Sequence, residues 1–407
     1  MAASLLTREP VLLRNLPEIA DTGAMRDILV HLGCRVRTAG TAELRIQARE
    51  VRHHAVPDEL GRRMRASILL LGPLLARTGQ SRVPRPGGDE IGARRVEQHL
   101  RGLRQMGAEV SETESEFVLR AERLHGARVI FDLPTVTGTE NVMMAAAVAD
   151  GRTEIINAAR EPHVQDLARF LNAAGAQVYG AGTDEIVIEG VPQLSGAHHR
   201  VISDYLEAGT YAIATAATGG DVTLECTPPP DELTTVLLKL QQAGVEIQAL
   251  QDAIRVRRSR RRRLLPVDMA TWIHPGFPTD LQAQYTALMT QADGQSVVSE
   301  YIFENRFQHV PELLRMGARI TVFGRSAIVQ GPAQLHATDV LVPDIRSGAA
   351  LLIAALCARG RTELRNAWHV DRGYQDPVGK LSELGAEIRR GVIGGRQENV
   401  DTAGYYE

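Results

Sequence analysis

The stretch Met106-Gly107-Ala108-Glu109-Val110 carries the signal that decides the fold, because it reads as a helix stopped by a glycine and followed directly by a strand. The same pattern, Leu/Met/Ala-Gly-small-x-Val/Ile, occurs five more times, at Leu32–Val36, Ala174–Val178, Ala243–Ile247, Met316–Ile320 and Leu384–Ile388. The six glycines follow one another at intervals of 74, 68, 69, 73 and 68 residues. Such a long period with mixed helix and strand predicts six α/β repeats rather than a solenoid.

A second helix recurs with the same period. It is apolar and rich in alanine, and it ends near a glycine in each case: Gly79, Gly151, Gly220, Gly294 and Gly360. Each repeat is therefore expected to hold a buried helix, a strand, an amphipathic helix and another strand. Six repeats in two sets of three predict two similar α/β domains, one over residues 1–203 and one over residues 204–407.

The repeat register predicts that the first repeat is truncated. Counting back about 70 residues from Gly79 places the first alanine-rich helix at Met1–Thr7, which is only the tail of such a helix. On this register, its first turns and the preceding loop and strand are expected to be missing. A start codon about 25 residues upstream of Met1 is the simplest explanation of this register.

Composition excludes several classes of protein. The formal net charge of −3 gives no general attraction to nucleic acid or to an anionic membrane. Three separated cysteines without a CxxC pair argue against a disulfide framework or a structural zinc site. The N-terminal residues do not resemble a signal peptide, and the apolar runs are too short to cross a bilayer. These features predict a cytoplasmic protein. The arginines of segment 255–263 lack interleaved aromatic residues, so we interpret them as a solvated strand and turn.

Polar residues recur where the buried helices are expected to begin. Arg65, Thr137, Asp280 and Arg346 each stand fourteen residues before the marker glycine of their repeat, and Asp204 stands sixteen before. Helix N-termini favour anionic ligands. Capping alone would explain Asp204 and Thr137, but arginine is not a capping residue. Arg65 and Arg346 are therefore candidates for anion binding.

Four loops carry candidate chemistry. Pro86–Arg95 is glycine-rich and charged, as in a lid that closes over a charged substrate, and His274–Gln284 contains Asp280, either a cap or a general base. Glu304, Asn305 and Arg306 lie together in an apolar stretch, either as a structural ion-pair knot or as functional residues. Arg372 lies in His369–Tyr374, and with Arg94 and Arg346 it could form a clamp for a phosphate and a carboxylate.

In this order, the loops resemble those of the UDP-N-acetylglucosamine 1-carboxyvinyltransferase family, the enolpyruvyl transferases that begin peptidoglycan precursor synthesis. The resemblance runs from Met1 to about Arg390 and is strongest at Arg65–Ile68, Pro86–Arg94, Thr135–Asn141, Ser203–Thr210, Phe277–Gln284, Ile302–Phe307 and His369–Tyr374. It implies a two-domain inside-out α/β barrel built from six βαβαββ-like repeats, with the active site between the domains.

The resemblance also implies roles for individual residues. Arg94, Arg346 and Arg372 would hold phosphoenolpyruvate, Asp280 would deprotonate the 3-hydroxyl of the acceptor, and Asp89 would protonate the methylene carbon. The residues implied to bind the UDP-sugar are Arg65, Arg94, Arg95, Val96, Glu97, Gln98, Thr135, Val136, Thr137, Asp280 and Ile302. The substrates are small molecules, no metal or organic cofactor is implied, and the chain is expected to be a monomer without nucleic-acid or membrane partners.

The chain departs from the family pattern at three places. The lid residue that is often cysteine is Asp89, which predicts insensitivity to the epoxide antibiotic fosfomycin, and Arg95 and Glu97 replace the usual proline and aspartate beside the uridine. The family's phosphoenolpyruvate-binding lysine belongs to the loop missing from the first repeat. Two alternatives to the enzyme therefore stay open: a non-catalytic paralogue that binds UDP-sugar, and an enolpyruvyl transferase with another acceptor.

Overall fold

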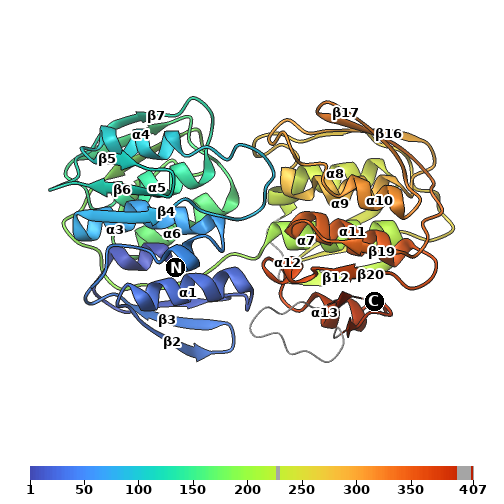
Figure 1. Ribbon diagram of the computed structural model, residues 1–407, viewed down its shortest axis with the longest axis horizontal. Helices are drawn as coiled ribbons and strands as arrows, with labels where there is room; N and C mark the ends of the chain where they lie inside the picture. Colours follow the sequence, from blue (N-terminus) through green and yellow to red (C-terminus); the bar gives the residue numbers. More distant parts are fainter. Residues whose placement is uncertain (226–229, 392–404, 407) are drawn as a thin grey trace. The chain divides into compact units, whose positions relative to one another are not determined.

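The computed structural model describes residues 1–225, 230–391 and 405–406, so Cys226 lies outside the described residues. The chain divides into two compact units (Figure 1). The first contains Met1–Gly88 and Arg94–Ile202, and the second contains Asp89–Ala93 and Ser203–Glu407. The central five residues of the predicted lid thus pack with the second unit, although the chain on either side of them belongs to the first.

The first unit contains three sheets, with strand orders β11-β1-β3-β2, β4-β6-β5 and β7-β8-β10-β9. Their strands are β1 Val11–Arg14, β2 Arg35–Gly40, β3 Glu43–Gln47, β4 Gln80–Pro84, β5 Glu109–Glu112, β6 Glu116–Arg120, β7 Arg128–Ile130, β8 Arg152–Ile156, β9 Gln177–Tyr179, β10 Glu185–Glu189 and β11 His198–Arg200. The helices and 3-10 turns between them are η1 Ala2–Leu6, α1 Ala20–His31, α2 Asp58–Gly61, η2 Arg65–Leu70, α3 Leu71–Thr78, α4 Glu97–Gln105, α5 Val136–Ala146 and α6 Pro162–Ala173.

The second unit repeats this plan, with strand orders β12-β14-β13, β15-β16-β18-β17 and β19-β20-β22-β21. Its strands are β12 Asp221–Glu225, β13 Glu246–Leu250, β14 Ala253–Arg257, β15 Met269–Ala270, β16 Gln295–Ser299, β17 Arg319–Phe323, β18 Ser326–Gln330, β19 Asp339–Leu341, β20 Glu363–Arg365, β21 Arg390–Gly391 and β22 Tyr405–Tyr406. Its helices and turns are α7 Tyr205–Thr218, η3 Pro230–Leu233, α8 Thr234–Gln242, η4 Thr279–Leu281, α9 Gln282–Met289, α10 Val310–Arg315, α11 Ile345–Cys357, α12 Trp368–Asp371 and α13 Pro377–Glu383.

The glycine that stops each amphipathic helix adopts the conformation that the sequence pattern predicts. All six glycines have positive φ, from 90° at Gly244 to 102° at Gly33, which residues with a side chain adopt only at a cost. In five of the six repeats a strand begins within two residues of this glycine. Each repeat also contains a hairpin strand that the pattern did not predict, for example β6 between β4 and β5.

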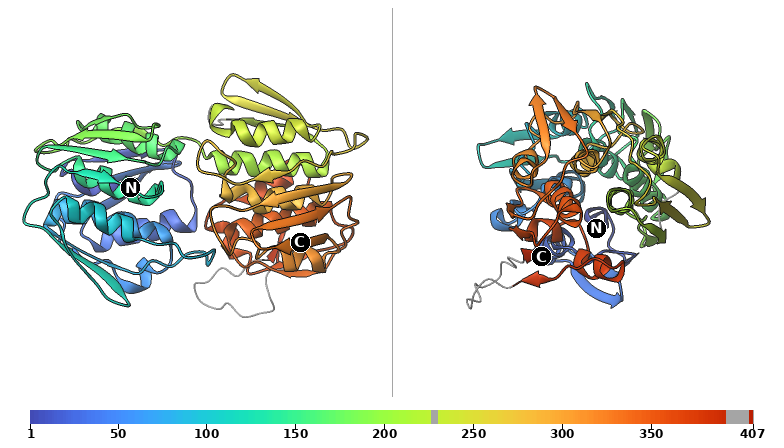
Figure 2. Two further views of the ribbon diagram at one scale, coloured as in Figure 1. Left: turned by 90° about the horizontal axis from the view of Figure 1, so that it is seen from above. Right: turned by 90° about the vertical axis from the view of Figure 1, so that its right-hand side faces the viewer.

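The alanine-rich helices form the inside of each unit, as the sequence predicts. In the second unit α7, α9 and α11 pack against one another, and all eight residues of α9 are buried. The sheets of that unit lie toward its outside (Figure 2). In the first unit α3 packs against α5 and η1 in the same way. This arrangement, with helices in the core and sheets outside, is the inside-out α/β barrel expected for the fold.

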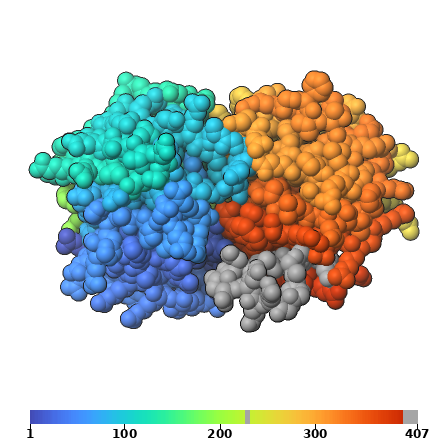
Figure 3. Space-filling model, in the orientation of Figure 1, coloured from blue at the N-terminus to red at the C-terminus, as the bar shows by residue number. Residues whose placement is uncertain are grey.

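Each unit has a hydrophobic core of its own. One core cluster runs from Ala2 to Ala197 and the other from Tyr205 to Leu381 along the chain. The space-filling view accordingly shows each half of the sequence as one continuous body (Figure 3). None of the helices in the described ranges is long and apolar enough to cross a membrane.

Candidate active site

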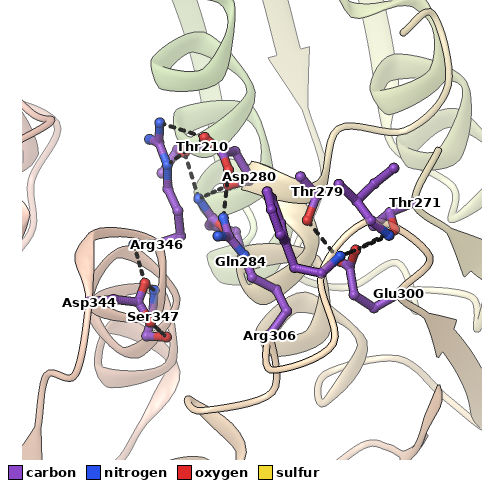
Figure 4. A network of polar contacts seen from close by, with 12 residues as sticks. Thr210, Thr271, Thr279, Asp280, Gln284, Glu300, Arg306, Asp344, Arg346 and Ser347 are labelled. Atoms are coloured by element: carbon purple, nitrogen blue, oxygen red, sulfur yellow. Dashed lines mark hydrogen bonds and ion pairs between the residues drawn. The ribbon is translucent and has the colours of Figure 1, made fainter. Parts of the chain in front are cut away.

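Asp280 lies in the turn η4 at the start of the buried helix α9, and its carboxylate is held by two arginines (Figure 4). Arg306 donates from Nη2 to Oδ1 at 2.6 Å. Arg346 donates from Nε and Nη2 to Oδ2 at 3.2 and 3.0 Å. Asp280 directly precedes Leu281, which occupies the N-cap position of α9. Two guanidinium groups fix the direction of the Asp280 oxygens.

Arg346 is positioned by the first turn of α11. Asp344 caps this helix and accepts hydrogen bonds from the backbone N–H groups of Arg346 and Ser347, both at 2.9 Å. Burial acts to lower the pKa of Arg346, but Asp280 and Tyr374 raise it, and the net pKa lies well above its ordinary value. The guanidinium therefore stays protonated at the start of a helix, where an anion is favoured.

Further polar side chains contact Arg346 and the backbone of Asp280. The hydroxyl of Tyr374 accepts from Nη1 of Arg346 at 3.1 Å and is hydrogen-bonded to Thr210 on α7 at 2.9 Å. Gln284 on α9 donates to the Thr210 hydroxyl at 3.2 Å and to the backbone oxygen of Asp280 at 3.0 Å. The starts of three buried helices are thereby tied to one another. A carboxylate between two guanidinium groups places a candidate general base beside groups that bind anions.

The central lid residues dock on the loop that holds Arg306. Glu304 accepts from the backbone N–H of Ala93 at 2.6 Å, and the backbone oxygen of Glu90 accepts from Asn305 at 2.9 Å and from Gln308 at 2.6 Å. Gly92 has φ +140°, and a Cβ there would lie 2.5 Å from Oε2 of Glu304. Glu304 and Asn305 are thus lid contacts, whereas Arg306 belongs to the Asp280 pair.

Asp89 and Arg372 form an ion pair within the second unit. Nη1 of Arg372, just after α12, lies 2.8 Å from Oδ1 of Asp89, and the two side chains are only 8% and 10% exposed. The implied proton donor and one implied phosphoenolpyruvate ligand therefore lie in direct contact.

In the first unit, Arg65 begins the 3-10 turn η2 and donates a hydrogen bond to the backbone oxygen of Arg94. Burial and the neighbouring Arg94 guanidinium lower the pKa of Arg65 to about 10. The contact places two guanidinium groups next to each other, an arrangement that suits an anionic ligand. Arg94 and Arg65 thus lie together, as the UDP-sugar prediction requires.

The remaining first-unit candidates surround the start of α5. Gln98 on α4 accepts from the backbone N–H of Asp132 at 2.7 Å and donates to the backbone oxygen of Leu133 at 3.0 Å. Thr135 caps α5 by accepting from Gly138 at 3.3 Å. The prediction that Thr137 is the cap is wrong, because the helix begins at Val136 and Thr137 instead bonds to the ring of His99 at 2.7 Å.

The other five predicted ligands differ in their exposure. Val96 is buried, whereas Arg95 and Glu97 beside it are exposed. Val136 is half-buried in the first turn of α5. Ile302 lies in the loop after β16, where its backbone N–H is bound to Glu300 at 2.8 Å.

Sequence reasoning missed Asp344, Gln284, Tyr374 and Thr210 as members of the site. Asp344 had a local signal, since aspartate is a preferred N-cap residue and it stands before an apolar, alanine-rich run. Gln284, Tyr374 and Thr210 meet only through the packing of helices distant in sequence.

Comparison with known proteins places the chain in a class. The family model of EPSP synthase (3-phosphoshikimate 1-carboxyvinyltransferase) matches residues 1–381. The solved enolpyruvyl transferase NikO from Streptomyces tendae superposes with a TM-score of 0.85 and 26% identity, over 95% of this chain and 92% of that one. An EPSP synthase from Acinetobacter baumannii, at 20% identity and a TM-score of 0.69, shares the fold. The fold and site define an enzyme of the carboxyvinyltransferase class.

More similar relatives give the family. Proteins named UDP-N-acetylglucosamine 1-carboxyvinyltransferase from Sorangium cellulosum and Acidobacterium capsulatum are 50% and 49% identical to this chain. The alignments cover 96% of this chain and 92% and 90% of the relatives. The chain belongs to the UDP-N-acetylglucosamine 1-carboxyvinyltransferase family.

Proposed function

We propose that this chain transfers the enolpyruvyl group of phosphoenolpyruvate to the 3-hydroxyl of UDP-N-acetylglucosamine and releases phosphate, the first committed step of peptidoglycan synthesis. The observation that carries the proposal is the carboxylate of Asp280, held between Arg306 and Arg346 at the start of α9. This geometry joins a base to fixed positive charge, as addition of a hydroxyl to an anionic substrate requires.

In the proposed reaction, Asp280 takes the proton of the 3-hydroxyl, and the hydroxyl oxygen bonds to C2 of phosphoenolpyruvate. Asp89 gives a proton to C3, and a tetrahedral adduct forms. The adduct then loses a proton from C3 and phosphate from C2, which restores the double bond in the enolpyruvyl ether. Arg94, Arg346 and Arg372 are the proposed ligands of phosphoenolpyruvate, since arginine binds carboxylate and phosphate in a bidentate manner.

The proposed UDP-sugar ligands are Arg65, Arg94, Arg95, Val96, Glu97, Gln98, Thr135, Val136, Thr137, Asp280 and Ile302. Support is strongest for Arg65 and Arg94, which lie together, and for Gln98, which is anchored to the Asp132–Leu133 backbone. Val96 is buried, so its contribution would come from the backbone.

The test is phosphate release by this chain with both substrates, beside Asp280→Asn. We expect release only when both substrates are present, and a loss of about 10²-fold or more in Asp280→Asn. Asp339→Asn, which changes an exposed ion pair with Arg365 in the same way, should retain the wild-type rate. A folded protein that binds UDP-N-acetylglucosamine but releases no phosphate would instead support a non-catalytic paralogue.

A different acceptor is favoured by one observation, the exposed Arg95 and Glu97 beside the proposed uridine site. Rates with a panel of nucleotide sugars would decide between acceptors, and a higher kcat/KM for another sugar would overturn the proposed one. Asp89 further predicts insensitivity to fosfomycin, because a carboxylate lacks the thiolate that the epoxide alkylates. Rapid inactivation by fosfomycin would contradict this. We also propose a cytoplasmic monomer that supports cell-wall biogenesis, cell shape and cell division.

A further inference from the structure

A second carboxylate, that of Glu300, is buried beside the Asp280 loop and has no role in the proposed reaction. Glu300 is 1% exposed and directly follows β16. The parallel pairing of β15 with β16 sets Ala270 opposite Ser299, so the next residues, Thr271 and Glu300, leave the sheet side by side. Three separate segments then meet at this one side chain (Figure 4).

The Glu300 carboxylate accepts four hydrogen bonds. Its Oε1 accepts from the hydroxyl of Thr271 at 2.9 Å and from the backbone N–H groups of Ile302 and Phe303 at 2.8 and 3.0 Å. Its Oε2 accepts from the hydroxyl of Thr279 at 2.9 Å. A buried carboxylate is unfavourable unless donors surround it, and here fixed donors occupy both oxygens.

These donors lie next to the residues that are proposed to contact the acceptor. Thr279 immediately precedes Asp280 in η4, and Ile302 is itself one of the donors. The hydroxyl of Thr271 also accepts from the backbone N–H of Tyr301 at 2.9 Å, which closes the network. Glu300 thus connects the loop that carries the general base to the loop that carries Ile302.

We infer that Glu300 is a positioning residue for acceptor deprotonation. It acts through Thr279 and the Ile302–Phe303 amides, which hold the Asp280 and Ile302 loops in fixed positions relative to each other. The inference rests on the proposed function. An error of about 1 Å in such a position can lower a rate by about 10²-fold, so one lost hydrogen bond should be measurable in kcat. The Arg306 and Arg346 contacts direct the Asp280 oxygens, whereas Glu300 fixes the backbone from which that side chain projects.

The test removes one bond at a time. Thr279→Val keeps the shape of the side chain and deletes the bond to Oε2, while Thr279→Ser keeps the hydroxyl. We expect Thr279→Val to lower kcat about 10-fold or more with KM for phosphoenolpyruvate changed less than about 2-fold, and Thr279→Ser to restore kcat. Thr286→Val is the control, since Thr286 is a buried threonine of α9 whose hydroxyl bonds to the local oxygen of Gln282 at 2.9 Å and not to Glu300.

Hydrogen exchange supplies a readout that does not depend on catalysis. Thr279→Val should accelerate exchange in peptides covering residues 277–284 and 300–308, and Thr286→Val should leave the second peptide unchanged. Wild-type kcat and wild-type exchange in Thr279→Val would overturn the inference. If the wild-type chain itself released no phosphate, the proposed function would fail, and the exchange of these two peptides would still decide whether Glu300 holds the loops.

Discussion

Asp89 and Arg372 show how one residue can alter the properties of a site. Both side chains are almost fully buried and lie 2.8 Å apart, so each supplies the counter-charge of the other. Under the proposed function phosphoenolpyruvate binds the same guanidinium. Asp89 and phosphoenolpyruvate therefore compete for Arg372 in this chain, in a way that an uncharged lid residue would not.

The competition predicts that kcat and the KM for phosphoenolpyruvate both decrease when the Asp89 carboxylate is removed. Asp89→Asn should lower kcat about 10²-fold or more, because a proton donor is lost, and should lower KM for phosphoenolpyruvate severalfold, because Arg372 is released. Steady-state kinetics test this, with Glu90→Gln as the control, since it changes the charge of the exposed neighbouring lid residue equally. A KM that stays constant or rises in Asp89→Asn would exclude competition.

Buried histidines make the stability of the protein depend on pH. Burial lowers the pKa of His309 to about 4, and its side chain is fully inaccessible. A histidine in the unfolded chain has a pKa near 6.5, so below that pH the unfolded state binds a proton at this residue and the folded state does not. The unfolding free energy contributed by His309 is therefore complete above pH 6.5 and is lost as pH falls toward 4.

We expect this loss to be up to about 1.4 kcal/mol for each pH unit between 6.5 and 4. His309→Leu should remove that part of the slope, which urea denaturation at pH 7.5, 6.5 and 5.5 would measure. His336→Leu is the control, because it replaces an exposed histidine by the same residue. An identical slope in wild type and His309→Leu would contradict the prediction.

At the scale of elements, arginines of the segment 255–263 cap the C-terminal end of helix α7. Arg258 donates to the backbone oxygens of Ala216 and Ala217, and Arg260 donates to those of Thr218 and Gly219. These are the last carbonyls of α7 and its cap, which have no partner within the helix. Other arginines of the segment pair with acids: Arg255 and Arg257 with Asp221, Arg262 with Glu246, and Arg263 with Asp293.

Removing the capping arginine should destabilise the second unit. Arg258→Ala is expected to lower the free energy of unfolding by about 1.5–3 kcal/mol, because hydrogen bonds from a charged group to buried carbonyls are lost. Arg257→Ala, which loses only exposed contacts at 3.8 and 3.7 Å, should change it by less than about 0.5 kcal/mol. Chemical denaturation measures both. Equal effects would show that α7 does not depend on this cap.

The elements also show what a sequence can predict. Helix stops were predictable at all six repeats because a glycine with positive φ acts locally. The start of α5 was misplaced by two residues, since Thr135 and Thr137 are both able to cap and only packing chooses between them. The partners of Asp280 were not predictable from position, because Arg306 and Arg346 lie 26 and 66 residues away and only the tertiary fold brings them together.

At the scale of the whole molecule, two separate cores predict two unfolding events. The first core lies between Ala2 and Ala197 and the second between Tyr205 and Leu381, with no shared members. Only Asp89–Ala93 crosses from the sequence of the first unit into the second. A domain with its own core can unfold as its own cooperative unit.

Calorimetry should therefore resolve two transitions, and matched core variants should assign them. Leu29→Ala in α1 and Leu288→Ala in α9 each create a cavity at a fully buried leucine, which costs about 2–5 kcal/mol. Leu29→Ala should lower the melting temperature of one transition and Leu288→Ala that of the other. One transition displaced by both variants would mean that the two cores unfold together. If each variant lowered the melting temperature of a different transition, each three-repeat unit would unfold independently. The lid segment Asp89–Ala93 would then be stabilised chiefly by the second unit, on which it docks.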